Sequence, residues 1–384
     1  MDIKLFDSPQ LRENLKPFTY TRPIAEIRVG ILKISEKWQN RGFNVSFDTE
    51  TYLQQKFGTP NKGIAINGAV CPTDELAEAI KSLQPGQSLY ANELLIAGNM
   101  DGEKVEFTGG FRMINHPWEI FQYNREQLEL DFTLITKDRV SAEISDPHTV
   151  VYGKENLFIE EGADIKAAVI NAEAGPVYIG NNTTINPGVL INGAFALCEN
   201  STLNMGTKLR GDATVGPHCK VGGEVSNSVI FGFSNKGHEG FLGNSVIGEW
   251  CNIGADSNTS NLKNNYAEVR LWDYGSGRFA KTGLQFCGLM MADHAKCGIN
   301  TMFNTGTVVG VGANVFGAGY PRNFIPSFSW GGAAGMSTFN LKKFAEVADA
   351  VMSRRHKAYD DTEERIIENI FEQSAQYRIW DNKA

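Results

Sequence analysis

A strict six-residue period runs through the middle of this 384-residue chain and limits how it can fold. Eight consecutive units carry an aliphatic residue at the same position: Ile179, Ile185, Ile191, Leu197, Leu203, Leu209, Val215 and Val221. The residue that follows is often Gly or Asn, and glycine readily adopts the left-handed backbone of a tight turn. An α-helix repeats every 3.6 residues and cannot produce this period. The pattern predicts a parallel β-helix, in which three units form one triangular coil with the aliphatic side chains inside.

The repeat weakens at both ends and breaks in the middle. Ile159 and Ile165 indicate an opening coil, and the period fails after Val221. The next positions in phase hold Asn227, Phe233 and Glu239. The rhythm returns, shifted by two residues, at Ile247 and Ile253, and further units are predicted at Ile299, Thr305 and Val311. We expect the interruption, residues 231–241, to form a loop that projects from the coil.

The chain divides into three regions that differ in the pattern of their apolar residues. Residues 1–143 alternate short apolar runs with helical stretches such as TDELAEAIKSL, residues 73–83, which predicts an α/β domain. Residues 144–330 carry the β-helix. Residues 331–384 include two stretches with helical spacing, 339–355 and 361–380. Because a solenoid has open ends, we expect these helices to cap its C-terminal end.

Charge and cysteine content narrow the possible functions. The net charge of -8 and the pI near 5.4 disfavour nucleic-acid binding, which needs a basic face. No run approaches the ~18 apolar residues of a membrane span, and the start MDIKLFDSPQLREN has no apolar signal region. Six cysteines without a CxxC pair fit a reducing compartment. We therefore expect a cytoplasmic protein without nucleic-acid or membrane partners.

Three segments around the break resemble the acetyltransferase half of GlmU-type enzymes. They are LRGDATVGPHCKVGGEV (209–225), SNKGHEGFLG (234–243) and IGEWCNIGADSNTSNLKNNY (247–266). These enzymes combine glucosamine-1-phosphate acetyltransferase and N-acetylglucosamine-1-phosphate uridyltransferase activities. The resemblance is greatest to the GlmU-related sugar nucleotidyltransferase-like proteins of Bacteroidetes. It covers residues 145–330, and the N-terminal region more thinly. It implies a left-handed coil, acetyl-CoA as acyl donor and a homotrimer.

The resemblance also implies roles for single residues. His238 matches the family's general base, and Phe241 stands where the family has Tyr. Arg210 matches a substrate-phosphate Arg, and the family's intervening Lys is replaced by Asn227 or Ser228. Ala255 matches a residue near the acetyl-CoA path. The other predicted substrate-binding residues are Lys236, Asn252, Asn261 and Lys263.

Amine acylation suits these residue types. An amine attacks a thioester as the free base, and a neutral imidazole can accept the proton released as the C–N bond forms. Arg210 and Lys236 are expected to hold the phosphate. We predict an acyl-CoA-dependent N-acetyltransferase for an amino-sugar phosphate in nucleotide-sugar biosynthesis. The competing interpretation makes His238 and Arg210 solvated surface residues and makes Asn252 and Asn261 turn formers.

The stretch LKPFTYTRPIAEIRVG, residues 15–30, resembles a sugar nucleotidyltransferase motif that reads L-x-P-L-T-x-x-x-P-K-x-L-x-P-V-G. The preceding DSPQLREN contains no glycine, whereas the family has a Gly-rich loop that cradles phosphates. Ile24 replaces the motif's Lys, and Asn67 is the nearest counterpart of its metal-binding Asp. These losses predict an inactive or rearranged nucleotidyltransferase site.

Two other functions stay open. In the first, the N-terminal domain also transfers a nucleotidyl group with Mg²⁺, using the candidate nucleotide-binding residues Arg22, Arg28 and Lys37; the alternative is that these pair with Glu26 and Glu36. In the second, the chain is a non-catalytic sugar-nucleotide-binding scaffold.

No metal site is expected in the coil. γ-Type carbonic anhydrases share the prism fold but need three His ligands with an H-x4-H pair, whereas His218, His238 and His294 are isolated here. Asp293 and His294 are predicted to be structural. Residues 354–356, Arg-Arg-His, are predicted to be a solvated helix face.

Overall fold

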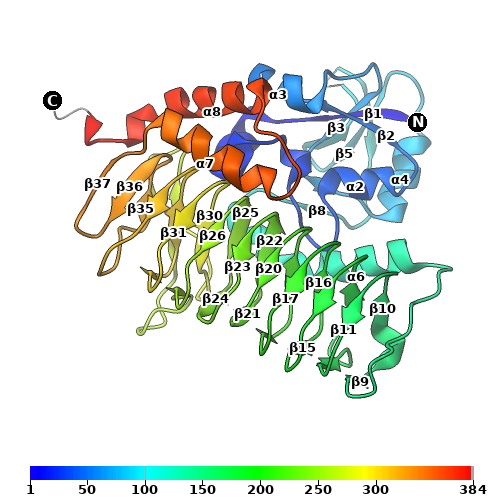
Figure 1. Ribbon diagram of the computed structural model, residues 1–384. Helices are drawn as coiled ribbons and strands as arrows, with labels where there is room; N and C mark the ends of the chain where they lie inside the picture. The colour runs from blue at the N-terminus through cyan, green and yellow to red at the C-terminus, as the bar shows by residue number, and fades with distance from the viewer. Residues whose placement is uncertain (100, 382–384) are drawn as a thin grey trace.

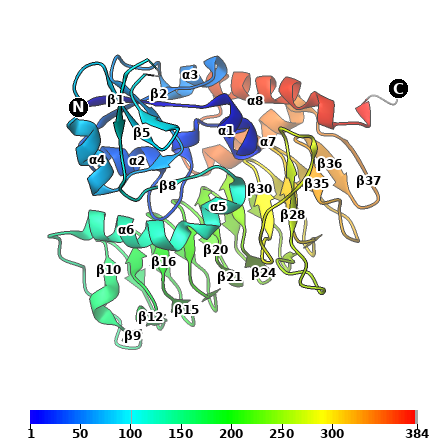
Figure 2. The same cartoon turned by 180° about the vertical axis from the view of Figure 1, so that it is seen from behind.

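A parallel β-helix with an α/β domain along one side dominates the computed structural model, which describes residues 1–99 and 101–381 (Figure 1; Figure 2). The predicted fold class is confirmed: an N-terminal α/β region, a parallel coil and C-terminal helices. Within the described residues, no helix has the length and apolarity needed to cross a bilayer.

The N-terminal region is built on a six-stranded sheet. The strand order is β2 (Asn44–Asp48), β1 (Asp2–Phe6), β3 (Ile64–Asn67), β6 (Leu94–Ala97), β5 (Gln87–Ala91) and β7 (Glu103–Glu106). Strand β4 (Val70–Cys71) pairs with β8 (Arg112–Met113). The helices are α1 (Pro9–Asn14), α2 (Ile34–Gln39), α3 (Thr51–Phe57), α4 (Asp74–Lys81), α5 (Pro117–Gln122) and α6 (Asn124–Thr136). Helix α4 begins as predicted, because Thr73 Oγ1 accepts a hydrogen bond from the Leu76 amide.

Each coil contributes one strand to each of three faces. The covered face has β10 (Leu157–Ile159), β13 (Val177–Ile179), β16 (Phe195–Leu197), β19 (Ala213–Val215), β22 (Val229–Gly232), β25 (Val246–Glu249), β30 (Leu289–Met291), β33 (Thr307–Val309) and β35 (Phe324–Ile325). The flanking face has β11 (Asp164–Ile165), β14 (Thr184–Ile185), β17 (Thr202–Leu203), β20 (Lys220–Val221), β23 (Asn235–Lys236), β26 (Asn252–Ile253), β31 (Lys296–Cys297), β34 (Asn314–Val315), β36 (Ser329–Gly332) and β37 (Gly335–Thr338).

The open face has β9 (Val150–Tyr152), β12 (Val169–Asn171), β15 (Leu190–Asn192), β18 (Lys208–Leu209), β21 (Glu224–Ser226) and β24 (Phe241–Gly243), followed by the pair β27 (Asn258–Thr259) and β32 (Met302–Phe303). All eight aliphatic residues of the sequence period are buried in the interior, together with Ile159 and Ile165, which confirms this part of the prediction. Ala142 and Ile144 pack against this core from its N-terminal side, and Met336 is a further partly buried contact.

The break in the period is a shortening of the coil, and the predicted projecting loop is wrong. Strand pairing matches Phe195 with Ala213, a coil of 18 residues, but Thr214 with Val229 and Val229 with Val246, coils of 15 and 17 residues. The missing residues shift the phase without interrupting the strands.

The predicted phase of the later units is also wrong. Ile299 lies in a turn and is 70% exposed. The interior positions there are Met291, Cys297, Phe303, Val309 and Val315, which repeat every six residues two positions earlier than predicted.

A long excursion leaves the coil after β27. Val246 of one coil pairs with Met290 of the next, so 44 residues separate positions that are 18 apart in a regular coil. The excursion carries an antiparallel hairpin, β28 (Arg270–Asp273) and β29 (Arg278–Lys281). This hairpin was not predicted from the sequence.

The C-terminal helices lie along the side of the coil, and the prediction that they cap its end is wrong (Figure 1). Helix α8 (Asp361–Gln373) contacts α3 of the N-terminal region. Helix α7 (Leu341–Ser353) places Phe344 5.4 Å from the His294 ring. Gly312 makes room for the Phe344 ring, because a Cβ at position 312 would stand 2.6 Å from that ring.

The N-terminal region packs on the covered face. Phe18 lies 5.4 Å from Phe231 between ring centroids, and Leu128 of α6 shares a cluster with Ala194 and Ala196. One core of buried residues runs through both regions. This packing covers one face of the coil, while the open face and much of the flanking face present exposed side chains, such as Arg210 and Asn252.

Candidate functional site

His238 lies at the corner where the chain passes from the flanking face to the open face. Residues 237–240 join β23 to β24, and the His238 side chain is exposed. The Asp256 amide donates to the Glu239 carbonyl oxygen over 2.9 Å, which places the turn of Ala255 beside it on the next coil. His238 and Ala255 therefore follow one another along one corner.

Lys236 occupies an interior position, which contradicts the prediction that it binds the sugar phosphate. It pairs with Val221 of the preceding coil and is 3% exposed. Its Nζ donates to the carbonyl oxygens of Gly222 and His238, each over 2.9 Å. Burial lowers the pKa of Lys236 to about 8, against the opposing influence of the Glu239 charge. Lys236 ties the backbone of His238 to the preceding coil.

Arg210 and Phe241 share the outer side of the open face. Strand pairing sets Lys208 opposite Glu224 and Glu224 opposite Phe241, so these three side chains form a row across three coils. Arg210 directly follows β18 and donates to Glu224 Oε1 over 3.0 Å, while its side chain is 68% exposed. An exposed ion pair contributes ~1 kcal/mol or less, so an anionic ligand could replace Glu224 as the partner of Arg210.

The other predicted site residues are dispersed. Asn252 is exposed on the flanking face. The Asn261 side-chain amide donates to Asn244 Oδ1 over 2.8 Å, just beyond the open face. Lys263 Nζ donates to the Glu268 carbonyl oxygen over 2.8 Å, within the excursion. A single chain therefore gathers only part of the predicted set on one face.

Arg22 and Arg28 are buried between the N-terminal region and the covered face, which contradicts the prediction that they bind a nucleotide. Arg22 forms an ion pair with Asp293, and its Nη1 lies 3.3 Å from Glu249 Oε1. Arg28 Nε donates to the Phe231 carbonyl oxygen over 3.2 Å. Both guanidinium groups bind the protein itself.

The position of Lys37 also contradicts the prediction that it binds a nucleotide. It is buried, and its Nζ donates to both carboxylate oxygens of Asp131 at 2.6 Å. The sequence offered Glu26 and Glu36 as alternative partners for these three cations. Of these contacts, Arg28 Nη2 lies 3.9 Å from Glu36 Oε2.

A cavity of about 500 Å³ lies at the carboxyl ends of β1 and β2, where parallel sheets commonly bind ligands. Its acidic lining residues are Asp7, Asp48 and Glu50. Asp7 accepts hydrogen bonds from Arg12 Nη1 over 2.6 Å and Thr49 Oγ1 over 2.5 Å. Nowhere in residues 1–99 or 101–381 do three or more Asp, Glu, His or Cys side chains form a group that could hold a metal. Asp7 is thus engaged by Arg12 and Thr49 and is not left free as a ligand for Mg²⁺.

Two of the isolated histidines, His218 and His294, belong to a stack of rings. His218, Phe233, Trp250 and His294 occupy successive corners with left-handed φ values of 53–62°. The ring centroids are 4.7, 4.3 and 6.2 Å apart in that order. Burial holds the pKa of His294 well below its usual range, so the buried imidazole is neutral.

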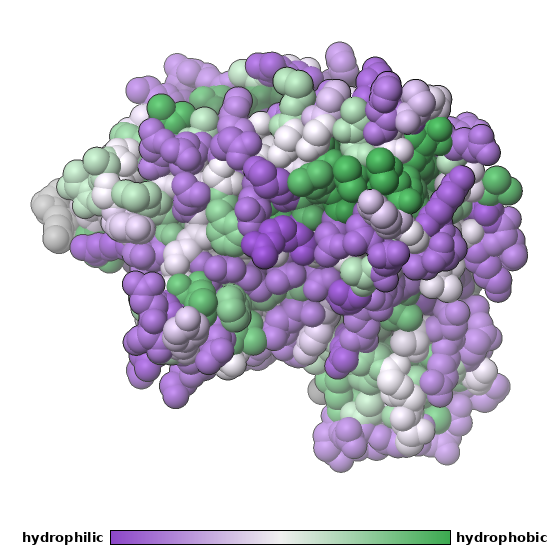
Figure 3. Space-filling view, turned by 90° about the horizontal axis from the view of Figure 1, so that it is seen from below, coloured by the Kyte–Doolittle hydropathy of each residue, from purple (hydrophilic) through white to green (hydrophobic). Residues whose placement is uncertain are grey.

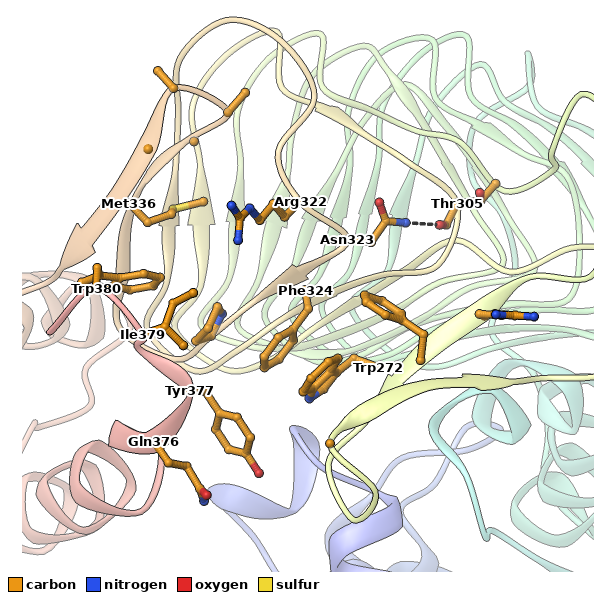
Figure 4. Close-up of a pocket in the computed structure, with 18 of the residues that line it drawn as sticks. Trp272, Thr305, Arg322, Asn323, Phe324, Met336, Gln376, Tyr377, Ile379 and Trp380 are labelled. Carbon is orange, nitrogen blue, oxygen red and sulfur yellow. Dashed lines mark hydrogen bonds between the residues drawn. The ribbon is translucent and has the colours of Figure 1, made fainter. Parts of the chain in front are cut away.

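A second cavity of about 1160 Å³, which was not predicted from the sequence, lies between the hairpin, the last coils and the C-terminal tail (Figure 4). Of the predicted site residues, Lys263 lines it. The unpredicted lining residues include Arg270, Trp272, Phe279 and Arg322. A signal for the hairpin was present, because RLWDYGSGRFAK has two short segments with aromatic residues on either side of a Gly-Ser-Gly turn.

Comparison with known proteins gives a family match for the first region and distant relatives for a larger part. Residues 3–140 match the family described as sugar nucleotidyl transferase. The bifunctional protein GlmU of Trichodesmium erythraeum is 33% identical over 108 residues, which cover 28% of this chain and 22% of that protein. A bifunctional sugar-1-phosphate nucleotidylyltransferase/acetyltransferase of Sulfurisphaera tokodaii is 27% identical over 55% of this chain and 46% of its own length.

The match to the GlmU protein of Methanococcus maripaludis covers 62% of this chain and 49% of that protein, at 27% identity. It therefore extends beyond residues 3–140. The chain spans less than half the length of each of these curated relatives. A solved structure, the polySia-specific acetyltransferase NeuO, matches with a TM-score of 0.26 and 16% identity over 51% of this chain and 85% of NeuO. The chain thus has a sugar nucleotidyltransferase-like domain and distant GlmU-type relatives.

Proposed function

We propose that the chain is an acyl-CoA-dependent N-acyltransferase that acts on an amino-sugar phosphate at the open face, with His238 as general base. The observation that carries the proposal is the placement of an exposed imidazole at the edge of a face that also presents Lys208 and Arg210. The cations would hold the phosphate of the acceptor. His238 Nε2 or Nδ1 would take the proton that the amine loses as it attacks the thioester.

The architecture around His238 supports this role. The two bonds that Lys236 donates fix the His238 backbone without occupying its ring. No hydrogen bond to the imidazole occurs within the part of the chain that the structure describes. A free imidazole at the surface can both accept a proton and reach a ligand. Acetyl-CoA is the acyl donor we expect, since the relatives that extend into the coil include proteins named acetyltransferases.

We further propose a homotrimer, in which donor and acceptor meet between neighbouring coils. Exposed apolar side chains gather on the N-terminal part of the open face, and Figure 3 shows apolar side chains on the underside of the molecule. The exposed apolar residues on this part of the open face are Val150, Tyr152, Val169 and Leu190. Burying such a patch between chains would stabilise an oligomer. Light scattering on the purified chain should give three times the monomer mass.

The test of catalysis is His238→Ala with acetyl-CoA and glucosamine-1-phosphate. Loss of a general base should lower kcat by about 10²–10⁴-fold. His148→Ala is the matched control, because His148 is also exposed but lies in a turn near β9, remote from His238 in the coil. Equal turnover in the two variants would rule out His238 as the base.

Nucleotidyl transfer by the N-terminal domain is the second candidate, because residues 3–140 match a sugar nucleotidyl transferase family. The cations expected to serve it are buried in internal contacts, and the adjoining cavity is acidic. Phosphoryl transfer depends on cationic stabilisation of spread negative charge. We therefore expect no pyrophosphate release from UTP and N-acetylglucosamine-1-phosphate with Mg²⁺. Release at a rate above the protein-free control would restore the bifunctional proposal.

The non-catalytic scaffold is the remaining alternative. It predicts that the chain binds a nucleotide sugar but not acetyl-CoA, which calorimetry distinguishes directly. Binding of acetyl-CoA together with turnover would exclude it.

A further inference from the structure

The cavity beside the hairpin is built by three segments that lie far apart in sequence. The hairpin strands β28 and β29 form one side, and residues 322–326 and 332–336 of the last coils form another. Residues 376–380 of the C-terminal tail close it. In Figure 4, Met336, Arg322 and Asn323 lie along one wall, with Trp380, Ile379 and Phe324 across from them. Its volume of about 1160 Å³ is large enough for a ligand bigger than a simple sugar phosphate.

The hairpin divides its side chains between two surfaces. Trp272 pairs with Phe279 in the antiparallel register, and Arg270 stands two residues before Trp272. Because side chains alternate along a strand, these three lie on one surface, which lines the cavity. Leu271 is buried on the opposite surface, in the core shared with the N-terminal region. This anchoring fixes the surface that faces the cavity.

Among the residues that the structure describes, the charged ones lining the cavity are all cationic: Lys263, Arg270 and Arg322. Arg270 and Arg322 are exposed, and neither has a carboxylate partner within residues 1–99 and 101–381. Asn323 adds a polar group and is held by its amide, which donates to the Thr305 carbonyl oxygen over 2.7 Å. Two unpaired guanidinium groups beside one hollow favour a phosphorylated ligand, since a guanidinium can bind phosphate through two parallel hydrogen bonds.

Aromatic rings supply the second half of the site. Trp272 stacks on Phe324 at 4.2 Å, and Phe279 contacts Trp272 edge-on at 5.4 Å while remaining 41% exposed. Trp380 comes from the tail, where its Nε1 donates to Thr338 Oγ1 over 2.8 Å. The aromatic wall is therefore fixed before any ligand arrives. Flat rings next to cations suit a planar heterocycle joined to phosphate.

We propose that this cavity binds a nucleotide, with Arg270 and Arg322 on its phosphates and the Phe279 and Trp272 side of the hairpin against its base. The site lies apart from His238, so it is an addition to the acyl-transfer proposal and does not depend on it. Either a nucleoside diphosphate, as in a sugar nucleotide, or the nucleotide end of a CoA thioester carries this chemistry. The two sources differ in the base and in the groups attached to the phosphates.

Calorimetric titration of the full chain with UDP, ADP, CoA and inorganic pyrophosphate tests the proposal without any turnover. We expect at least one of the first three to bind at least tenfold more tightly than pyrophosphate. Tightest binding of CoA would identify the thioester as the source, and tightest binding of UDP or ADP would identify a nucleoside diphosphate. Arg322→Ala and Arg270→Ala should each weaken binding of the tightest nucleotide by about tenfold.

Phe279→Leu separates base recognition from charge. It should weaken nucleotide binding about five- to tenfold while leaving pyrophosphate binding unchanged. Arg278→Ala is the matched control, because Arg278 is exposed on the same hairpin but pairs with Asp273 on the opposite surface. Thermal melting confirms that each variant is folded. The proposal is overturned if none of the ligands binds, if pyrophosphate binds as well as the nucleotides, or if the two arginine variants bind like the wild type.

Discussion

The covered and open faces are built from different strands of the same coils, and their cations lie in opposite environments. On the covered face, Arg22 reaches across from the N-terminal region to Asp293 and Glu249, and all three are largely withdrawn from water. On the open face, Arg210 pairs with Glu224 in contact with solvent. The residue types are the same, but one pair is part of a core and the other is available to a ligand.

The difference shows that burial and partners, not residue type, decide whether a cation can recognise a phosphate. In the sequence, Arg22, Arg28 and Lys37 look like a cluster of phosphate-binding residues, yet each is bonded to other residues of the protein. Arg210 looks like an ordinary surface charge and keeps its guanidinium free enough to exchange partners. Substituting a buried cation should therefore mainly lower stability, whereas substituting the exposed Arg210 should mainly weaken ligand binding.

The largest effect is expected from Arg22→Met. It leaves Asp293 and Glu249 buried without their cation, and breaking a buried pair in this way typically costs about 3–5 kcal/mol. Urea denaturation at pH 7 measures the loss. Arg112→Ala is the control, because the pair of Arg112 with Glu126 at 2.8 Å is nearly half exposed and should contribute ~1 kcal/mol or less. Equal losses in both variants would contradict the distinction between the two kinds of pair.

The same variant should change acid stability. Burial opposes ionisation of Glu249, but the charges of Arg22, Lys33 and Lys56 together more than offset it and lower the pKa of Glu249 to about 2, with Arg22 as the largest of the three. A carboxylate with a depressed pKa stabilises the folded state above its unfolded pKa, near 4.3, and this contribution is lost as the pH falls toward 2. The wild type should lose more unfolding free energy across that window than Arg22→Met does.

Lys236 gives an intermediate case, a buried cation bonded to carbonyl oxygens instead of a carboxylate. An unfolded lysine titrates near 10.4, whereas the folded pKa of Lys236 is about 8. Between these values the unfolded state binds more protons, so the free energy of unfolding should rise with pH, by up to about 3 kcal/mol. Lys236→Met should lack this rise when urea denaturation is compared at pH 7 and pH 10. A parallel pH response in wild type and variant would show that Lys236 stays protonated.

The regular coil could be predicted because one residue in six has a single physical task. Ile179 to Val221 fill the prism, and any other period would put them in water. The break was harder, because losing three residues or one from a coil leaves every strand in place and moves only the phase. Lys236 then takes an interior position that no aliphatic pattern would assign to it.

The site was less predictable than the coil. The sequence placed His238, Arg210 and Phe241 in neighbouring units, and the structure sets Arg210 and Phe241 on one face with His238 at its edge. It could not reveal which face the N-terminal region covers, because that depends on contacts between residues more than 200 positions apart, such as Arg28 with Phe231. The cavity beside the hairpin likewise depends on three separate segments, residues 270–279, 322–336 and 376–380, coming together.

The smallest effect on stability, and the sharpest contrast with Arg22, is expected from Arg210→Ala. The exposed pair with Glu224 should be worth ~1 kcal/mol or less, so the melting curve should hardly move. If Arg210 binds the acceptor phosphate, KM for glucosamine-1-phosphate should instead rise about tenfold with kcat nearly unchanged, because a contact made equally in the ground and transition states affects binding alone. Lys166→Ala is the control, since Lys166 forms a comparable exposed pair with Asp164 at 2.9 Å in the first coils. A rise in KM shared by both variants would reflect the general charge of the coil, and an unchanged KM in Arg210→Ala would remove Arg210 from the acceptor site.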